Sequence, residues 1–241
     1  MTVTEKTWPV ADLLALAAAL LEKSGLDHAK AETVAELLVE ADLMGHDTHG
    51  LALLPRYLEE IAAGAMTIKG EPDVIRDTGS CITWDGRRLP GVWLVAMALD
   101  LALDRAMIHG VATAVIRNSH HIGCLAAYLP RATERGYMLI ISSTDPSNAS
   151  VAPFGGTQAV FTPNPVAVGI PTGADPILID TSASITTNKM GCVNWMSIAM
   201  TYCSRHLVWR PGYGISGAVD TSAMPVPAII CRLSGIRARR L

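Results

Sequence analysis

The sequence lacks several features that mark particular classes of protein. Its five cysteines include no C-x-x-C pair, so neither a disulfide framework nor a structural zinc site is indicated. No stretch approaches the roughly 20 apolar residues of a membrane-spanning helix. The first ten residues carry no apolar stretch of the kind found in signal peptides. We therefore expect a protein of the reducing cytoplasm that does not associate with membranes.

An excess of positive charge is also absent. The 241 residues contain 19 Lys and Arg against 22 Asp and Glu, which gives a net charge of -3 at pH 7. A nucleic-acid-binding protein usually carries a basic surplus, so we expect no nucleic-acid partner. Half of the residues are hydrophobic, which excludes a disordered chain, and the length fits one large domain or two small ones.

Common nucleotide-binding and hydrolase motifs are missing or misplaced. The sequence contains no P-loop and no G-x-S-x-G motif. Residues 212–217 match G-x-G-x-x-G, the fingerprint of many dinucleotide-binding domains. That fingerprint needs a preceding strand, a following helix and an acidic residue about 20 positions further on. Pro211 precedes the match directly and no acidic residue follows Asp220, so we interpret the match as accidental.

Hydrophobic periodicity predicts a mixed α/β fold behind an N-terminal helical region. Leucines and alanines at helical spacing, with Asp27 as an N-cap of the second helix, predict these helices: 11–24, 28–43, 51–63, 92–109 and 124–135. Short apolar runs between turn residues predict these strands: 73–85 in pieces, 111–116, 138–143, 166–170 and 177–179. We therefore divide the first part of the chain into a helical region, 1–72, and an α/β domain, 73–188.

The composition changes abruptly near residue 189. Residues 189–241 contain seven Lys or Arg and a single acidic residue, Asp220, and they follow neither helical nor strand periodicity. A basic tail can bind nucleic acid or membranes, or can be a solvated chain end. Our hypothesis is a third alternative: these residues are an atypical, out-of-frame tail that replaces a lost C-terminal part. Sequencing the gene around codon 189 tests this hypothesis.

The first group of candidate catalytic residues lies between Gly45 and Gly50. His46 and His49 are three residues apart and could share a metal ion on a helix, but no H-E-x-x-H pattern or third ligand accompanies them. We expect no metal. The flanking glycines indicate a loop instead, in which Thr48 and His49 face a cleft, and histidine is well suited to moving protons near neutral pH.

A second group follows the predicted strands. His120 and His121 come directly after strand 111–116, and Asp180 follows the apolar run 177–179. Ligand-binding groups of α/β proteins often lie at the carboxyl ends of strands. Asp180 could also simply cap a turn, and Asn164, held between two prolines, could contact a ligand or merely shape its turn.

Arg56 is the candidate for binding a substrate carboxylate. It lies seven residues after His49, and a guanidinium can hold a carboxylate through two parallel hydrogen bonds. The alternative is an ordinary surface arginine on a helix.

Five motifs in this order resemble one known family over about residues 10–188, and the similarity stops near Asn188. They are 41–50 (ADLMGHDTHG), 118–123 (NSHHIG), 153–156 (PFGG), 162–165 (TPNP) and 178–182 (LIDTS). Together they are similar to the malate/L-lactate dehydrogenase family of type 2, which also contains ureidoglycolate, sulfolactate and diketogulonate dehydrogenases or reductases.

The resemblance implies an oxidoreductase that uses NAD or NADP to interconvert small 2-hydroxy and 2-oxo acids. It implies a nucleotide-binding domain that is not a standard Rossmann fold, and usually a homodimer. By the resemblance, the catalytic residues are Thr48, His49, His121 and Asp180. The implied nucleotide contacts are His121, Thr144, Asn164, Asp180, Thr181 and Ser182.

Two departures from the family pattern matter. Leu53 stands where many relatives carry an arginine, so Arg56 is left as the candidate carboxylate ligand, and Thr48 replaces the commoner serine but keeps the hydroxyl. Relatives also exceed 300 residues. The alternatives to an active dehydrogenase are therefore a truncated, catalytically inactive remnant of the family and, from the histidine pairs alone, a metal hydrolase.

Overall fold

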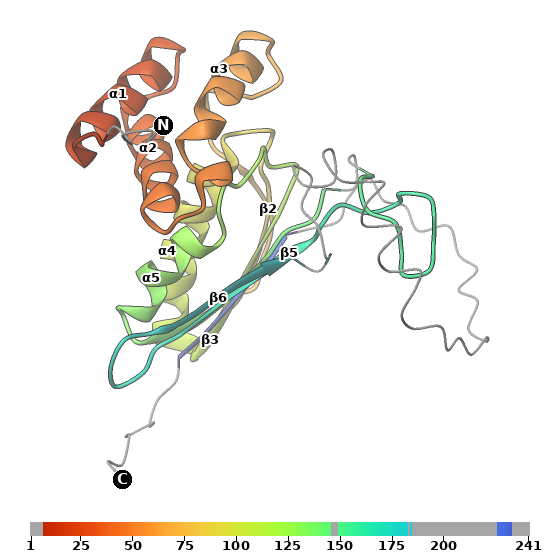
Figure 1. Cartoon of the computed structure of the whole chain (residues 1–241). Helices are drawn as coiled ribbons and strands as arrows, with labels where there is room; N and C mark the ends of the chain where they lie inside the picture. The colour runs from red at the N-terminus through yellow and green to blue at the C-terminus, as the bar shows by residue number, and fades with distance from the viewer. Residues whose placement is uncertain (1–6, 146–148, 183, 185–225, 233–241) are drawn as a thin grey trace.

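Seven strands form one sheet, and the helices lie on one of its faces in a computed structural model that describes residues 7–145, 149–182, 184 and 226–232 (Figure 1). The helices are α1 (Val10–Lys23), α2 (His28–Leu43), η1 (Asp47–His49), η2 (Leu51–Leu53), α3 (Leu54–Ala62), α4 (Gly91–His109), η3 (Ala126–Tyr128) and α5 (Leu129–Thr133). The strands are β1 (Asp73–Asp77), β2 (Cys81–Asp85), β3 (Val111–Arg117), β4 (Tyr137–Ser142), β5 (Pro165–Ile170), β6 (Ile177–Ser182) and β7 (Val226–Arg232). The mixed α/β class expected from the sequence is confirmed.

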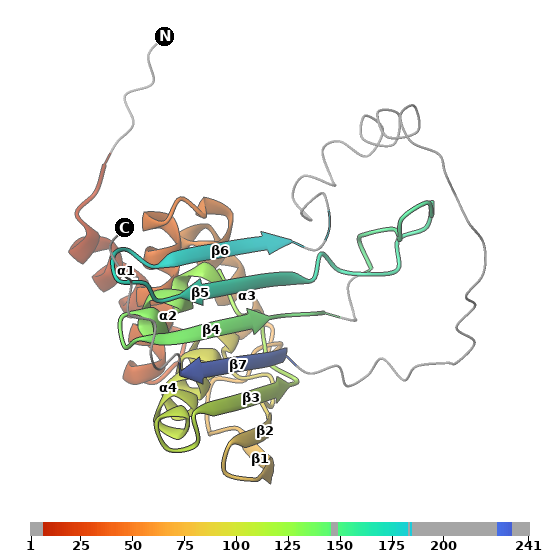
Figure 2. The ribbon, with the colours of Figure 1, turned by 90° about the horizontal axis from the view of Figure 1, so that it is seen from below.

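The strand order brings several strand ends to one edge of the sheet. The order is β1-β2-β3-β7-β4-β5-β6 (Figure 2). Strands β2 and β3 pair in parallel, and each of the pairs β3–β7, β7–β4, β4–β5 and β5–β6 is antiparallel. Strands β2, β3, β4 and β6 therefore run in the same direction and end at the same edge, which we call the carboxyl edge. Ligand sites of α/β proteins form at such an edge.

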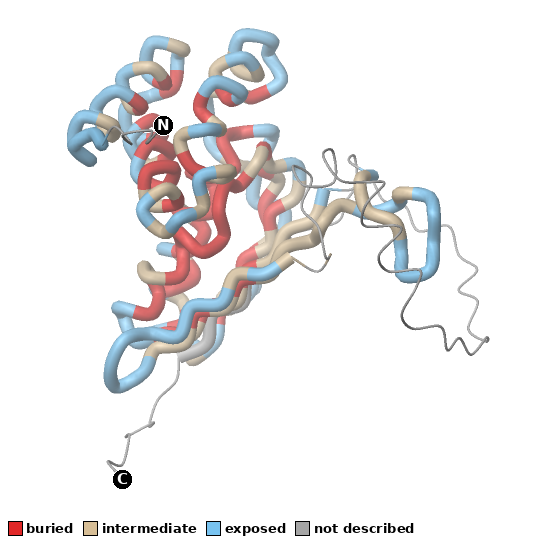
Figure 3. The backbone as a smooth tube through the Cα atoms, in the orientation of Figure 1, coloured by how far each residue is buried: buried red, intermediate tan, exposed pale blue. Residues whose placement is uncertain are grey.

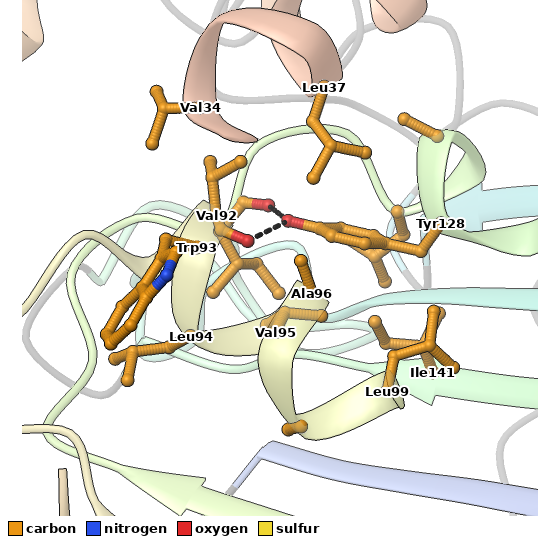
Figure 4. Packing of buried hydrophobic residues seen from close by; sticks show 14 of the residues in the cluster. Val34, Leu37, Val92, Trp93, Leu94, Val95, Ala96, Leu99, Tyr128 and Ile141 are labelled. Atoms are coloured by element: carbon orange, nitrogen blue, oxygen red, sulfur yellow. Dashed lines mark hydrogen bonds between the residues drawn. The ribbon is translucent and has the colours of Figure 1, made fainter. Parts of the chain in front are cut away.

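The hydrophobic core surrounds α4, with the sheet on one side of this helix and α2 on the other (Figures 3 and 4). Side chains of β4 alternate between buried and half-buried, and Leu139 and Ile141 point toward α4. Burying each such side chain stabilises the fold by about 1.5–3 kcal/mol. In the same core, the Tyr128 hydroxyl donates to the carbonyl oxygen of Ile122 at 2.6 Å and lies 3.4 Å from that of Val92. These contacts fix the segment after β3 against the start of α4.

Most of the predicted elements are confirmed. The helices expected at 11–24, 28–43 and 92–109 agree with α1, α2 and α4 within one residue, and the side chain of Asp27 accepts a hydrogen bond from the Lys30 amide at 3.0 Å as the predicted N-cap. The helix expected at 124–135 is shorter, because only η3 and α5 form. Helix 51–63 begins with the turn η2 before Pro55, which as a proline suits the first turn of α3.

The segment 189–241 contributes one described element. Strand β7 inserts between β3 and β4, so the sheet extends beyond the expected boundary at residue 188. Pro227 pairs opposite Val115 and has no backbone N–H to donate, which is unusual for a central strand. The G-x-G-x-x-G match at 212–217 lies outside the described residues. Among the described helices, none is long and apolar enough to cross a membrane.

Candidate active site

The Thr48–His49 pair lies in a short turn that the Asp42 side chain holds in place. Asp42 is near the end of α2, and its Oδ2 accepts a hydrogen bond from the Leu51 amide at 2.8 Å. A side chain at Gly50 would overlap the Asp42 carboxylate, so only glycine allows this approach. In η1, Thr48 Oγ1 lies 2.8 Å from His49 Nδ1. The turn therefore presents a hydroxyl already hydrogen-bonded to an imidazole.

His121 lies in the segment that follows β3, at the carboxyl edge. The start of α4 supports this segment from one side, because Gly91 lies so close that any side chain there would overlap the carbonyl oxygen of His120 and approach that of His121 within 2.6 Å. The His120 amide also donates to the Leu89 carbonyl oxygen at 3.1 Å. The backbone that carries His121 is thus fixed before any ligand binds.

The two histidine-bearing segments meet. The rings of His49 and His121 have centroids 5.9 Å apart and are inclined by 24°, so they lie in a loose, nearly parallel stack. They are 72 positions apart in the sequence, and the fold brings them together.

Tyr57 is a site residue that the sequence analysis missed. It lies on α3, is 2% exposed, and its hydroxyl is 2.8 Å from His121 Nδ1. Its ring also meets the ring of His120 edge to face, with centroids 5.7 Å apart. The sequence offered one signal for Tyr57. It is an aromatic residue directly after Arg56, at a position that helical periodicity places on the buried side of α3.

Glu60 lies on α3, one turn after Arg56. Both Arg56 and His120 contact its carboxylate. His120 is 5% exposed and its Nε2 lies 2.8 Å from Glu60 Oε2. Arg56 Nε donates to Glu60 Oε1 at 3.0 Å, and the arginine side chain is largely exposed. His120 is therefore a buried histidine whose Nε2 lies beside a carboxylate and whose Nδ1 has no partner among the described residues, and Arg56 is exposed with its guanidinium bound to a carboxylate of its own helix.

Asp180 lies on β6 and faces the segment after β3. Its Oδ2 accepts a hydrogen bond from the Ala126 amide at 2.9 Å and one from the Cys124 thiol at 3.8 Å. The carboxylate thus caps the start of η3. Its negative charge also acts on His49, where it raises the pKa and partly offsets the effect of burial.

Burial keeps the histidines of this site neutral. Burial lowers the pKa of His49 below 6.5. Burial, together with the nearby His49 and Arg56, lowers the pKa of His121 to about 4. Burial likewise lowers the pKa of His120, against the opposing charge of Glu60. Perturbed histidines grouped at one edge of a sheet are typical of functional sites.

The expected nucleotide contacts lie further along the carboxyl edge. Thr144 follows β4, and the pairing of Pro165 with Ser182 puts Asn164 beside the end of β6. The Ser182 hydroxyl donates to the Pro163 carbonyl oxygen at 3.1 Å, and the neighbouring Thr181 is exposed. The sheet therefore brings Thr144, Asn164, Thr181 and Ser182 to the edge that carries His121.

Asn164 has two unusual features. Its φ is +48°, in the left-handed region, and its Oδ1 is buried without a hydrogen-bond partner among the described residues. A buried amide oxygen without a partner is costly, and a hydroxyl or carboxamide of a bound nucleotide would satisfy it.

One group of side chains has the chemistry of a metal site. His46, Cys124 and Asp180 each place one ligand atom within 4.8 Å of the others. The thiol and the carboxylate are already hydrogen-bonded to each other, and burial raises the pKa of Cys124 to about 11. A thiol ligand must be deprotonated to bind a metal, so this environment does not favour metal binding.

A group of neutral histidines beside a carboxylate, at the carboxyl edge of a mixed sheet, has the chemistry that proton transfer requires. The chain belongs to the malate/L-lactate dehydrogenase family, whose model matches residues 8–192. The family expected from the five motifs is therefore confirmed.

Relatives and solved structures agree with this family assignment. Hydroxycarboxylate dehydrogenase B of Escherichia coli O157:H7 is 31% identical over 88% of this chain and 56% of its own length. A dehydrogenase from Sinorhizobium meliloti is 37% identical, with a TM-score of 0.71 over 78% of this chain and 54% of that one. Malate dehydrogenase from Pyrococcus horikoshii OT3 is 31% identical, with a TM-score of 0.71 over 77% of this chain and 56% of that one.

The extent of the matches corrects one expectation. The family model ends at residue 192, close to the predicted end of similarity at Asn188. The match to hydroxycarboxylate dehydrogenase B covers 88% of the chain, so it continues beyond Asn188, and the expectation is wrong for that relative. The chain spans about half the length of the curated relatives it matches.

Proposed function

We propose that this chain is an NAD(P)-dependent oxidoreductase that interconverts a small 2-hydroxy acid and its 2-oxo acid, with a histidine as acid and base. The observation that carries the proposal is the stacked pair His49 and His121 at the carboxyl edge, in a chain of a dehydrogenase family. Relatives named malate, L-lactate and sulfolactate dehydrogenase support this substrate class. One relative is named as NADP-dependent, which supports a nicotinamide cofactor and leaves NAD and NADP as alternatives.

The residues of the carboxyl edge fit a nicotinamide nucleotide, which supplies or accepts a hydride when bound. Asn164 offers the buried amide oxygen that has no partner among the described residues, and Thr144 and Thr181 add hydroxyl groups. The Ser182 hydroxyl is already engaged with Pro163, so we assign it to shaping this part of the edge. Asp180 holds the start of η3 and sets the electrostatic environment of His49.

The protein contributes proton transfer and orientation. In the reducing direction, a protonated histidine gives its proton to the carbonyl oxygen of the 2-oxo acid, and Thr48 holds His49 through Nδ1. A positioned histidine of this kind accelerates a reaction by about 10²–10⁴-fold. Arg56 would bind the substrate carboxylate, which would replace Glu60 Oε1 as its partner.

The test is a nucleotide titration followed by an activity assay. We expect NADH or NADPH to change its fluorescence when the purified chain is added, and pyruvate or oxaloacetate to be reduced with loss of absorbance at the nicotinamide band. Replacing both His49 and His121 by Ala should abolish turnover while nucleotide binding persists. Unchanged turnover in that double variant would contradict the catalytic assignment.

A second candidate function has its own supporting observation. The chain covers 56% or less of several relatives, so a catalytically inactive remnant of the family is the alternative. Absence of both nucleotide binding and 2-oxo acid reduction would favour the remnant.

We further propose that the protein is a cytoplasmic homodimer, and light scattering of the purified chain measures its mass in solution.

A further inference from the structure

The Nδ1 atom of His121 is surrounded by hydrogen-bond donors. The backbone amide of Gly123 lies 3.2 Å from it, and the Tyr57 hydroxyl lies 2.8 Å from it. An amide N–H can only donate, so Nδ1 must carry a lone pair. The single ring proton of the neutral imidazole is then on Nε2, which has no hydrogen-bond partner among the described residues.

His49 is held differently. Its Nδ1 faces the hydroxyl of Thr48 at 2.8 Å, and a hydroxyl can either donate or accept. Rotation of the Thr48 hydroxyl satisfies Nδ1 with or without a proton. His49 can therefore gain and lose a proton without breaking its hydrogen bond, whereas His121 cannot be protonated at Nδ1 without setting an N–H against the Gly123 N–H.

We propose that Tyr57 and the Gly123 amide hold His121 as a neutral Nε2–H tautomer, so that His121 is a fixed hydrogen-bond donor to the substrate and His49 alone exchanges the proton. Tyr57 is then a positioning residue that acts through His121. This inference rests on the proposed function for the identity of the substrate, a 2-oxo acid. The tautomer itself is a property of the protein without any ligand.

The proton and electron balance of the reaction assigns each histidine one task. In the proposed reduction a bound nicotinamide would supply the hydride for the carbonyl carbon, and the His49 imidazolium would give its proton to the carbonyl oxygen and become neutral. His121 Nε2–H donates a hydrogen bond to the same oxygen and keeps its proton. In the oxidising direction, neutral His49 takes the hydroxyl proton. A fixed donor aimed at an oxygen that gains negative charge stabilises the transition state.

The groups around His121 favour its neutral form. Three groups that are or can become positive face it, and the negative charge that opposes them is Asp145, after β4. The facing groups are His49 from η1, Arg56 and Tyr57 from α3, and His120 and Asp145 from the segments that follow β3 and β4. Burial and this surplus of positive charge lower the pKa of His121 to about 4.

Tyr57 is well held for this role. It is 2% exposed, and burial raises the pKa of its hydroxyl well above 10, so the hydroxyl keeps its proton and remains a donor. The edge-to-face contact with the His120 ring holds the phenol ring in place. Because the Gly123 amide already makes Nδ1 of His121 an acceptor, the Tyr57 hydroxyl must donate to it.

The first experiment is nitrogen NMR of the histidine side chains in the full chain without ligand. The signal of His121 is assigned by its absence in His121→Gln. We expect that signal to show a proton on Nε2 and a bare Nδ1 from pH 8 down to about pH 5. In Tyr57→Phe, where one donor to Nδ1 is gone, we expect the pKa of His121 to rise. A wild-type His121 that carries its proton on Nδ1, or that titrates near pH 6.5, would overturn the proposal.

The second experiment compares substitutions that keep or remove a neutral donor. Gln can place an N–H near the Nε2 position of His121, and Leu cannot. We expect His121→Gln to retain at least tenfold more kcat than His121→Leu, with the pH profile of the wild type, and His49→Gln to lose about 10²–10⁴-fold. If His121→Gln lost as much kcat as His49→Gln, His121 would be the proton-exchanging group and the proposal would be wrong.

Tyr57→Phe has a matched control in Tyr137→Phe. Tyr137 is also buried, but it begins β4 at the end of the sheet opposite the carboxyl edge. We expect Tyr57→Phe to lower kcat by about tenfold, the effect of one lost hydrogen bond, and Tyr137→Phe to leave it unchanged. An equal loss in both variants would mean a structural role for Tyr57.

The two experiments separate this inference from the proposed function. A chain with the expected His121 tautomer that reduces no 2-oxo acid contradicts the proposed function and leaves the tautomer assignment standing. A chain that reduces 2-oxo acids but carries the other tautomer contradicts this inference alone.

Discussion

The Asp42 carboxylate occupies the space into which any side chain at Gly50 would extend. The same carboxylate accepts the Leu51 amide, so it holds the turn that carries Thr48 and His49. The glycine after His49 is thus explained by a contact with the end of α2, since its φ of -92° is not in the left-handed region that favours glycine.

Gly50→Ala should therefore displace this turn. We expect a loss of about 1–3 kcal/mol in the free energy of unfolding, measured by urea denaturation, and a fall in kcat that exceeds any change in nucleotide binding. Gly45→Ala is the matched control, because Gly45 has a φ of +82° but no atom within 4 Å of an added side chain. Gly45→Ala should lower the free energy of unfolding by the backbone strain alone, about 1–2 kcal/mol. Equal effects on kcat in both variants would contradict the role of Asp42.

Gly91→Ala should disturb the other histidine segment. The new methyl group would overlap the carbonyl oxygen of His120, and because that atom belongs to the backbone, the segment must move. We expect about 1–3 kcal/mol of destabilisation and a shifted nitrogen NMR signal of His121. A variant as stable as the wild type, with an unchanged His121 signal, would show that α4 does not support this segment.

The low pKa of His121 predicts a loss of stability in mild acid. The folded protein protonates His121 near pH 4, whereas the unfolded chain protonates it near pH 6.5. Its contribution to stability is therefore complete above pH 6.5 and is lost as the pH falls toward 4, by up to about 3 kcal/mol. Urea denaturation between pH 7 and 4 measures the decline, and it should be smaller in His121→Gln.

His28→Gln is the control for that measurement. His28 is exposed at the start of α2, and its hydrogen bond to Glu22, together with the charge of Glu32, raises its pKa. Its contribution has the opposite sign, since it is present at low pH and lost as the pH rises. If stability declined as little in His28→Gln as in His121→Gln, the loss in the wild type would not come from His121.

Asp180→Asn should change the pH at which the enzyme works best. Burial lowers the pKa of His49 and the negative charge of Asp180 opposes this, so removing that charge should lower the pKa further. We expect the pH optimum of 2-oxo acid reduction to move to lower pH, because His49 must be protonated in this direction. Asp175→Asn, at an exposed turn between β5 and β6, is the control and should leave the optimum unchanged.

Much of the fold was predictable because its elements have strong local signals. Helix α4 and strand β4 follow their apolar periods closely, and Asp27 is a typical N-cap. The pairing of β3 with β7 was not predictable, because β7 lies in a segment without clear periodicity and contains a proline. The division at residues 72 and 188, and the out-of-frame origin of the tail, stay predictions.

The site residues that stand in sequence motifs were predictable, and those that reach the site through helix packing were not. His49 and His121 stand in recognisable loops, so their convergence could be expected. The contact between Tyr57 and His121 joins residues 64 positions apart and depends on how α3 packs, which no local pattern of the sequence encodes. The contact of His120 with Glu60 also depends on how α3 packs, whereas the Arg56–Glu60 pair is a local i,i+4 contact that fits the alternative of a surface arginine on a helix.

Strand β7 has a consequence for synthesis on the ribosome. It comes last among the described strands, yet it pairs on both sides and joins β1-β2-β3 to β4-β5-β6. Until residue 232 has emerged, β3 and β4 each keep an unpaired edge, and such edges invite pairing with other chains. The growing chain therefore keeps these two edges open to aggregation until residue 232 has been translated.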